Sequence, residues 1–217
     1  EARPEEGPLY TETRLEGLSS PPDAQARGLR SPNQTDADGA GGITLDFRKL
    51  IRDVPDFPKT GIVFKDITTL TRDPEGFRAS VDAIAGRYAD SGVDAVVGVE
   101  ARGFIFGAAV AYRMGVGVGP ARKPGKLPAE TVKAEYELEY GTDAIEMHRD
   151  AIEPGQRVLI VDDLLATGGT AAAAAKLVEE LRGEVVAIAF VVDLAFLKGR
   201  DKLAGHDVFC LIEYGEE

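Results

Sequence analysis

Residues 157–170 read Arg-Val-Leu-Ile-Val-Asp-Asp-Leu-Leu-Ala-Thr-Gly-Gly-Thr, the most informative run of the chain. The four apolar residues 158–161 predict a short strand in a parallel sheet, because a strand covered on both faces shows no polar alternation. Asp162 and Asp163 follow this strand, and the alanine-rich residues 171–181 favour a helix. The order of strand, acidic pair, glycine loop and helix therefore indicates an α/β unit.

The loop of this unit has the composition of a sugar-phosphate site. Backbone N–H groups at a helix N-terminus face an anion, and glycine lets the main chain approach it closely. Adjacent carboxylates are poor phosphate ligands but good acceptors for a vicinal diol. Either feature alone is more often a plain turn or a helix cap, whereas their combination in this order predicts a site. The loop residues concerned are Ala166, Thr167, Gly168, Gly169 and Thr170.

Composition limits the classes of protein to consider. The chain has 217 residues and is 44% hydrophobic, which suits one α/β domain. A net charge of −12 argues against a general nucleic-acid surface. The single cysteine, Cys210, excludes an internal disulfide framework. Because no apolar stretch approaches 18 residues and no signal peptide is visible, we expect a cytoplasmic protein without a membrane partner.

Two regions differ in composition. Residues 1–42 are rich in proline and glycine and almost free of periodic apolar residues. Such a segment cannot bury enough surface to offset its ordering entropy, so we expect a disordered N-terminal extension. Residues 43–217 carry the hydrophobic patterns of a folded domain.

The order of predicted elements indicates a doubly wound α/β fold with a mostly parallel sheet flanked by helices. Strands are expected at 95–99, 116–121, 158–161, 185–192 and 208–212, with a half-exposed strand around 136–140; helices are expected at 77–88, 103–114, 171–182 and about 195–204, with a short helical turn over 47–51. Ligands of such sheets bind beyond the carboxyl ends of the strands. Asp162, Arg102 and Arg122 all follow strands, so they should share one face.

Four basic residues are candidates for anion contacts. Arg122, Lys123 and Lys126 fall in a five-residue stretch that belongs to a Pro/Gly loop. This loop is either a solvated turn or a diphosphate site. Arg102 stands at a predicted helix start, where the helix dipole disfavours a cation. It therefore serves either a ligand or an ion pair with Glu100, and the sequence does not separate these two.

Two further residues have alternative interpretations. Glu139 lies where an alternating strand pattern ends at a glycine, so it is either an exposed edge residue or a proton-transfer group beside a nucleobase. Phe64 lies in a Pro/Gly-punctuated stretch and is either a core residue or a stacking partner for a purine ring.

Several segments together resemble one family. They are residues 55–68 (PDFPKTGIVFKDIT), 100–104 (EARGF), 122–128 (RKPGKLP), 138–141 (LEYG), 161–170 (VDDLLATGGT) and 196–200 (FLKGR). In this order they resemble the adenine phosphoribosyltransferases, a branch of the type I phosphoribosyltransferases. The resemblance covers about residues 46–214 and implies that family's fold, with a small N-terminal hood (about 46–69) and a flexible lid (about 123–142).

The resemblance also implies a reaction: adenine and 5-phospho-α-D-ribose 1-diphosphate give AMP and diphosphate. The loop 166–170 would hold the 5′-phosphate, while Asp162 and Asp163 would hold the ribose hydroxyls and stabilise a cation-like sugar. The four basic residues Arg102, Arg122, Lys123 and Lys126 would meet the diphosphate. Mg²⁺ would be bound largely through substrate oxygens and water, so no protein metal site is expected.

The base site follows from the same resemblance. Val63 and Phe64 would enclose adenine against Leu197, with main-chain groups reading its edge, and Glu139 would handle the proton on N7. Lys65 and Tyr140 belong to the same implied binding set. The family also implies a homodimer. Two alternatives remain: a transferase for hypoxanthine, guanine or xanthine, and a non-catalytic regulator that senses phosphoribosyl diphosphate. Residues 1–42 disfavour the regulator, because they lack helix-turn-helix periodicity and positive charge.

Overall fold

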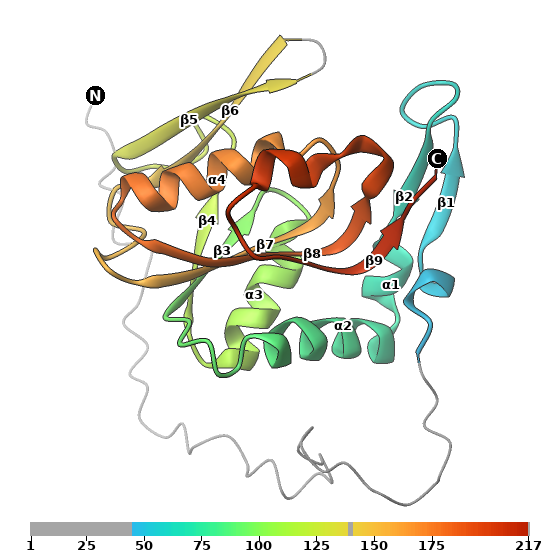
Figure 1. Cartoon of the computed structure of the whole chain (residues 1–217), viewed down its shortest axis with the longest axis horizontal. Helices are drawn as coiled ribbons and strands as arrows, with labels where there is room; N and C mark the ends of the chain where they lie inside the picture. Colours follow the sequence, from blue (N-terminus) through green and yellow to red (C-terminus); the bar gives the residue numbers. More distant parts are fainter. Residues whose placement is uncertain (1–44, 139–140, 217) are drawn as a thin grey trace, which may run out of the picture. The chain divides into compact units, whose positions relative to one another are not determined.

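A five-stranded parallel sheet forms the centre of the computed structural model, which describes residues 45–138 and 141–216. The strands are β3 (Ala95–Val99), β4 (Gly117–Ala121), β7 (Arg157–Leu165), β8 (Glu184–Leu194) and β9 (Val208–Tyr214). They lie in the order β4-β3-β7-β8-β9, and every neighbouring pair is parallel (Figure 1). The predicted fold class is confirmed. The expected disorder of residues 1–42 lies outside the described residues.

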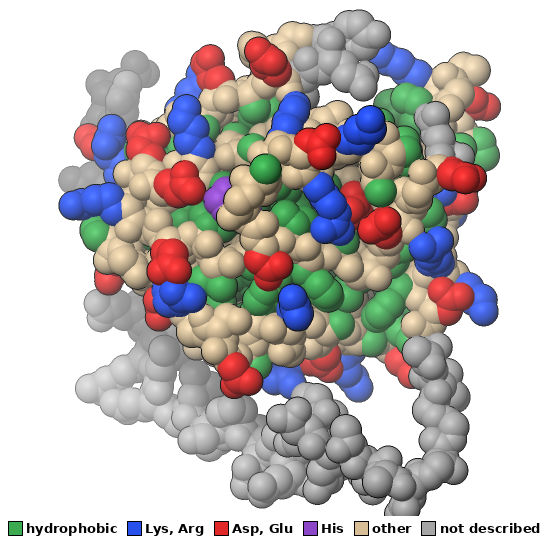
Figure 2. All heavy atoms as spheres, in the orientation of Figure 1, with side chains coloured by type: hydrophobic (Ala, Val, Ile, Leu, Met, Phe, Trp, Pro, Cys, Tyr) green, Lys and Arg blue, Asp and Glu red, His purple; other side chains and the backbone are tan. Residues whose placement is uncertain are grey.

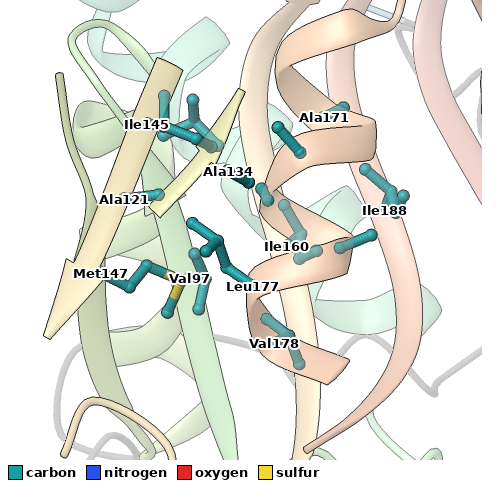
Figure 3. Packing of buried hydrophobic residues seen from close by; sticks show 14 of the residues in the cluster. Val97, Ala121, Ala134, Ile145, Met147, Ile160, Ala171, Leu177, Val178 and Ile188 are labelled. Atoms are coloured by element: carbon teal, nitrogen blue, oxygen red, sulfur yellow. The ribbon is translucent and has the colours of Figure 1, made fainter. Parts of the chain in front are cut away.

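Helices cover both faces of this sheet. Figure 1 shows α4 (Gly169–Glu180) on one face, and α2 (Pro74–Arg87) and α3 (Gly103–Met114) on the other. Each face has its own cluster of buried apolar side chains. In Figure 3, Leu177 of α4 lies beside Val97 and Met147, in the cluster that also holds Val178, Ile160 and Ile188. The alanines of α4 leave little side-chain bulk between helix and sheet, so the start of α4 lies close to the end of β7.

Local sequence signals set the helix ends. Asp73 caps α2, because its side chain accepts a hydrogen bond from the N–H of Gly76 at 2.7 Å, and Pro74 occupies the first turn. Gly115 ends α3 in the left-handed region, at φ 74°. The predicted helix over 103–114 therefore matches α3, and the helix predicted over 77–88 starts three residues earlier.

Two antiparallel hairpins stand outside the sheet. The first joins β1 (Arg52–Pro55) to β2 (Val63–Asp66), between a 3₁₀ turn at Phe47–Leu50 and the short helix α1 (Thr68–Arg72). The second joins β5 (Thr131–Leu138) to β6 (Gly141–His148). Figure 1 shows the first hairpin beside β9 and the second beyond α4, at opposite ends of the sheet. They occupy the regions expected for the hood and the lid.

Several elements differ from the sequence prediction, among them the unpredicted strands β1 and β2. Strand β7 continues to Leu165, so the acidic pair lies within the strand instead of after it, and Asp162 pairs with Phe190 of β8. Strand β6 was not predicted. The helix expected over 195–204 is two 3₁₀ turns, Ala195–Leu197 and Gly199–Leu203. Lys198 between them has a left-handed φ of 55°, which interrupts a continuous helix.

The surface carries both charges. Figure 2 shows basic and acidic side chains interspersed over one face of the molecule. None of the helices in the described part of the chain has the length and apolar character that a membrane crossing requires.

Candidate active site

The glycine loop sits at the start of α4 and encloses a small hollow. Gly168 is the N-cap of this helix and has a left-handed φ of 77°. The hollow is lined by Asp162, Leu164, residues 165–171 and Phe190. Because the free N–H groups of a helix N-terminus converge on such a loop, the arrangement suits a bound phosphate.

The acidic pair lies next to this loop and is nearly covered. Asp162 and Asp163 are 9% and 5% exposed. The backbone N–H of Asp163 donates to Oδ1 of Asp162 at 2.8 Å. Burial, and then the adjacent charge of Asp163, raise the pKa of Asp162 well above its ordinary value. One carboxyl group of the pair can therefore hold a proton and donate it in a hydrogen bond, while the other accepts.

Arg102 faces the acidic pair. Its Nε donates to Oδ2 of Asp163 at 2.5 Å, and its guanidinium lies 5.1 Å from the centre of the Phe64 ring. Arg102 precedes α3, as predicted. The predicted alternative of an ion pair between Arg102 and Glu100 is wrong, because Glu100 pairs with Arg122 instead. Close packing brings α3 to the acids: a Cβ on Gly103 would lie 2.6 Å from Oδ1 of Asp162. Glycine at 103 is thus required by this approach.

Glu100 organises the basic loop that follows β4. Its Oε2 accepts from Nε of Arg122 at 3.1 Å and from the backbone N–H of Lys123 at 2.9 Å. Arg122 also donates to the carbonyl oxygen of Lys126 at 3.0 Å. Burial opposes the ionisation of Glu100, but the hydrogen bonds from Lys123 and Arg122 outweigh it and lower the pKa of this carboxyl. The ionised glutamate therefore fixes the conformation of the loop.

Lys123 connects the basic loop to the second hairpin. Its ammonium contacts the carboxylate of Asp143 on β6 and donates to the hydroxyl of Tyr136 on β5 at 2.8 Å. The hydroxyl of Tyr136 in turn donates to Asp143 at 3.1 Å. Burial lowers the pKa of Lys123, but the contacts with Asp143 and Tyr136 outweigh this and raise it. Lys123 thus stays charged between the loop and the hairpin.

A larger cavity of about 300 Å³ brings these groups together. It is lined by Glu100, Ala101, Arg102, Lys123, Asp162, Asp163, Leu164 and Thr170. Asp162 and Thr170 line both this cavity and the loop hollow, so the two spaces adjoin. A ligand with phosphate at one end and a second anionic group at the other could span them.

The predicted base residues lie outside these two spaces. Phe64 packs edge-on against Phe57 at 5.2 Å between ring centres and also contacts Arg102, which places it at the border of the large cavity. Val63 is partly buried, and Leu197 on the first 3₁₀ turn after β8 is 37% exposed. The interpretation of Phe64 as a plain core residue does not fit its position beside Arg102.

The side chains of Lys65 and Lys126 do not line the cavity. The ammonium of Lys65 is buried, pairs with Asp53 at 2.8 Å and lies 4.4 Å from the ring centre of Tyr214. Because side chains alternate along β2, Lys65 points away from the face that carries Phe64. Lys126 is exposed and lines neither space. Glu139 and Tyr140 lie outside the described residues.

Sequence reasoning missed Tyr136 and Asp143 and treated Glu100 only as a partner for Arg102. The alternation around Tyr136 was visible, but strand β6, which carries Asp143, was not recognised. Only the pairing of β5 with β6, which places Tyr136 opposite Asp143, reveals their shared contact with Lys123.

Comparison with known proteins identifies the family of this chain. The sequence model of a family described as "Phosphoribosyl transferase domain" matches residues 66–213. The adenine phosphoribosyltransferase of Solibacter usitatus is 60% identical over 169 residues, which are 78% of this chain and 98% of that protein. The corresponding protein of Clostridium perfringens is 61% identical over 170 residues, 78% of this chain and 99% of that one.

Solved structures give the same result. The adenine phosphoribosyltransferase of Thermoanaerobacter pseudethanolicus has a TM-score of 0.76 and 56% identity, covering 77% of this chain and 98% of that one. The Saccharomyces cerevisiae enzyme, complexed with an imino-altritol bisphosphate and adenine, has a TM-score of 0.73 and 44% identity, covering 76% and 96%. The chain therefore belongs to the adenine phosphoribosyltransferase family.

Proposed function

We propose that this chain transfers the phosphoribosyl group of 5-phospho-α-D-ribose 1-diphosphate to adenine, forming AMP and diphosphate, through the residues described above. The observation that carries the proposal is the buried acidic pair: both carboxylates line the Arg102 cavity, and Asp162 also lines the glycine-loop hollow. The yeast relative was crystallised with a sugar-like bisphosphate and adenine, and a Trypanosoma brucei relative with AMP, pyrophosphate and ribose-5-phosphate. Those ligands have the chemistry that these two adjoining spaces suit.

In this proposal the sugar phosphate lies across the loop and the acids. Residues 166–170 would hold the 5′-phosphate through backbone N–H groups at the start of α4. Asp162 and Asp163 would accept hydrogen bonds from the ribose hydroxyls, and the raised pKa of Asp162 would let this carboxyl donate one as well. Negative charge on the pair would stabilise positive charge that develops on the sugar as the bond to diphosphate breaks.

The leaving diphosphate would meet the basic residues that line the large cavity beside the acidic pair. Arg102 and Lys123 both line this cavity, and both are paired with carboxylates, Asp163 and Asp143. Diphosphate would compete for these cations, since charge-assisted bonds to phosphate are as strong as those to carboxylate. Arg122 would act at the border of the cavity, where Glu100 holds it. Lys126, exposed on the same loop, would reach the diphosphate only after a loop movement.

Mg²⁺ fits this site as a substrate-bound ion. Among the described residues no three His, Cys, Asp or Glu side chains are grouped closely enough to hold a metal. The two buried carboxylates that line the cavity match the Mg²⁺ preference for one or two carboxylates together with phosphate oxygens and water. When bound, the ion would neutralise charge on the diphosphate; Asp162 and Asp163 are the side chains that would reach it or its waters.

Adenine would lie at the border of the cavity. The faces of Val63 and Phe64 would enclose the ring against Leu197, and the backbone of Lys65 would read its edge, because the lysine side chain is engaged by Asp53 and Tyr214. As the N9–C1′ bond forms and the C1′–diphosphate oxygen bond breaks, the carboxylate of Glu139 would accept the proton on N7. Tyr140, next in sequence, would help to close the site.

We further propose that residues 123–142, which include β5 and the first residues of β6, form a lid that excludes water from the activated sugar. The contacts of Lys123 with Tyr136 and Asp143 support a link between the diphosphate loop and the β5–β6 hairpin. A cytoplasmic location accompanies the proposal, because both substrates are intermediates of metabolism inside the cell.

A homodimer is also proposed. Helix α3 carries large apolar side chains on its exposed side, Ile105 at 45% and Tyr112 at 86% exposure, and the neighbouring edge strand β4 adds Val118 at 50%. Such a surface suits burial against a second copy. Light scattering should give twice the monomer mass for the native chain, and Tyr112→Glu should shift it toward the monomer; a monomeric native chain would contradict the proposal.

Turnover measured with each purine base distinguishes an adenine transferase from a transferase for another purine. Absorbance changes should be followed with phosphoribosyl diphosphate, Mg²⁺ and, separately, adenine, hypoxanthine, guanine and xanthine. We expect turnover with adenine at rates well above those with the three oxopurines. Turnover of an oxopurine without turnover of adenine would refute the assignment, and binding of phosphoribosyl diphosphate without any turnover would favour a regulator.

A further inference from the structure

An ion pair between a buried carboxylate, Asp193, and a partly exposed arginine, Arg200, lies at the end of β8, outside both spaces of the active site. Asp193 is completely buried, and its Oδ2 accepts from Nε of Arg200 at 2.7 Å. Its Oδ1 has no hydrogen-bond partner among the described residues, and the nearby thiol of Cys210 is only a weak donor. A buried carboxylate with one oxygen unsatisfied is expensive, and well-packed apolar residues would usually stabilise the fold as much or more. The pair therefore calls for an explanation other than stability.

Arg200 connects three parts of the chain. Besides Asp193 on β8, its guanidinium donates to the carbonyl oxygen of Val208 at the start of β9, at 3.1 Å. It also lies 3.9 Å from the carboxylate of Glu213 near the end of β9. The planar fork of arginine makes such simultaneous contacts possible, which a lysine cannot reproduce. The turn that carries Arg200, Gly199–Leu203, is thereby fixed against the ends of two strands.

The same turn touches the phosphate loop directly. A Cβ on Gly168 would lie 2.3 Å from the carbonyl oxygen of Gly199, and a Cβ on Gly199 would lie 2.2 Å from the carbonyl oxygen of Ala166. The two backbones are thus in contact without side chains between them. Leu197 lies just before this turn, separated from Gly199 by Lys198 in its left-handed conformation. A displacement of Gly199 would move both the loop and Leu197.

We propose that Asp193 and Arg200 form a positioning pair that fixes the base site and the phosphate site relative to each other. The pair holds the turn at Gly199, the turn supports the loop at Ala166 and Gly168, and the same segment places Leu197. Neither side chain touches a substrate. This inference rests on the proposed roles of Leu197 in binding adenine and of the loop in binding the 5′-phosphate.

The test compares Arg200→Met and Arg200→Lys in the full chain. With the turn released, the Met variant should show higher KM values for both adenine and phosphoribosyl diphosphate and a loss of kcat/KM of roughly 100-fold, the cost of a displacement near 1 Å. The Lys variant should recover part of this loss, because it keeps the charge but not the fork. Should the Met variant fail to fold, the KM values of the Lys variant decide whether Arg200 positions the two sites.

Arg157→Met is the matched control. Arg157 begins β7 at the other end of the sheet, pairs with Glu184 at 2.6 Å and donates to the carbonyl oxygen of Ser91. It is thus the same residue type, likewise held by a carboxylate and a backbone carbonyl oxygen, although its partner Glu184 is exposed. Both Met variants should lower the melting temperature, but only Arg200→Met should change the two KM values. Wild-type KM values in folded Arg200 variants, or a change for one substrate alone, would overturn the inference.

Leu197→Ala separates this inference from the proposed function. It should raise the KM for adenine only, and combining it with Arg200→Met should give less than the sum of the two effects on adenine, because both act through one side chain. An unchanged adenine KM in Leu197→Ala would refute the proposed base site and the base half of this inference. If Leu197→Ala raises the KM for adenine while the Arg200 variants keep wild-type KM values, only the role of the positioning pair would be overturned.

Discussion

Replacing Glu100 by glutamine tests how the basic loop is held. The carboxylate of Glu100 accepts from Nε of Arg122 at 3.1 Å and from the N–H of Lys123 at 2.9 Å. Glutamine keeps the shape and one acceptor oxygen but loses the charge, and its amide group would face the guanidinium with the wrong polarity if it turned. The substitution therefore loosens the loop without creating a cavity.

The magnitude follows from the contacts that are lost. A hydrogen bond to a charged group contributes about 1.5–3 kcal/mol, and glutamine would keep a neutral version of one bond. Arg122 is 31% and Glu100 18% exposed, so solvent screening reduces the charge contribution. We expect the ordered loop to lose about 1–2 kcal/mol, which is a factor of about 5–30 in an equilibrium. The KM for phosphoribosyl diphosphate should rise by about that factor, and the KM for adenine should not change.

The pH dependence has a defined sign. The pKa of Glu100 is below its ordinary value in the folded chain, because hydrogen bonds from Lys123 and Arg122 outweigh the opposing effect of burial. Its contribution to stability is therefore full above the ordinary glutamate pKa and is lost as pH falls through the lowered one. Denaturant unfolding followed from neutral pH down through the lowered pKa should show a smaller acid-induced loss for Glu100→Gln than for the native chain.

The control is Glu184→Gln, which removes the charge from an exposed pair with Arg157 far from the site. It should change stability by no more than about 1 kcal/mol and leave both KM values unaltered. An unchanged KM for phosphoribosyl diphosphate in Glu100→Gln, or an equal rise for adenine, would refute the assignment of this loop to the diphosphate.

Three further predictions concern the loop, the proton-transfer group and the N-terminal segment. Gly168→Ala should lose activity and at least ~1–2 kcal/mol of stability, because a Cβ would be strained at φ 77° and would collide with Gly199. The control Gly155→Ala, at φ 86° in open space, should lose stability alone. Equal kinetics in the two variants would contradict this prediction. Glu139→Leu should lower kcat at least ~10-fold, and a near-native kcat would count against its role. Deletion of residues 1–42 should leave activity and melting temperature unchanged; a large loss in either would show that this segment supports the fold.

The pattern of apolar residues was sufficient to predict the strands of the sheet and its main helices. The buried strand β3 (Ala95–Val99) and the helix α3 (Gly103–Met114) match the predicted ranges, because continuous apolar runs and a small-residue helix leave few alternatives. The acidic pair and the glycine loop were also recognised from their order in the chain. The parallel register of β3 and β7, which follows from the fold class, brings Asp162 to Arg102. Thr170 reaches Asp162 through the loop between β7 and α4.

Partners of individual side chains could not be predicted in this way. Arg102 binds Asp163 and not Glu100, although Glu100 is closer in sequence, because β3 and β7 are neighbours in the sheet. Strand β6 escaped notice because two consecutive buried residues break its alternation. The 3₁₀ turns after β8 read as a helix, since neither the left-handed Lys198 nor the contact between Gly168 and Gly199 is encoded in a local pattern.

The rate of AMP formation by Asp162→Asn/Asp163→Asn shows whether the reaction takes place at the buried acidic pair. The double variant keeps the shape of the pair but removes the charge that would stabilise the developing positive charge on the sugar. With adenine, phosphoribosyl diphosphate and Mg²⁺, the native chain should form AMP, and the double variant should be slower by roughly 100-fold or more while remaining folded. A folded double variant that forms AMP at the native rate would contradict the placement of the reaction at this buried acidic pair.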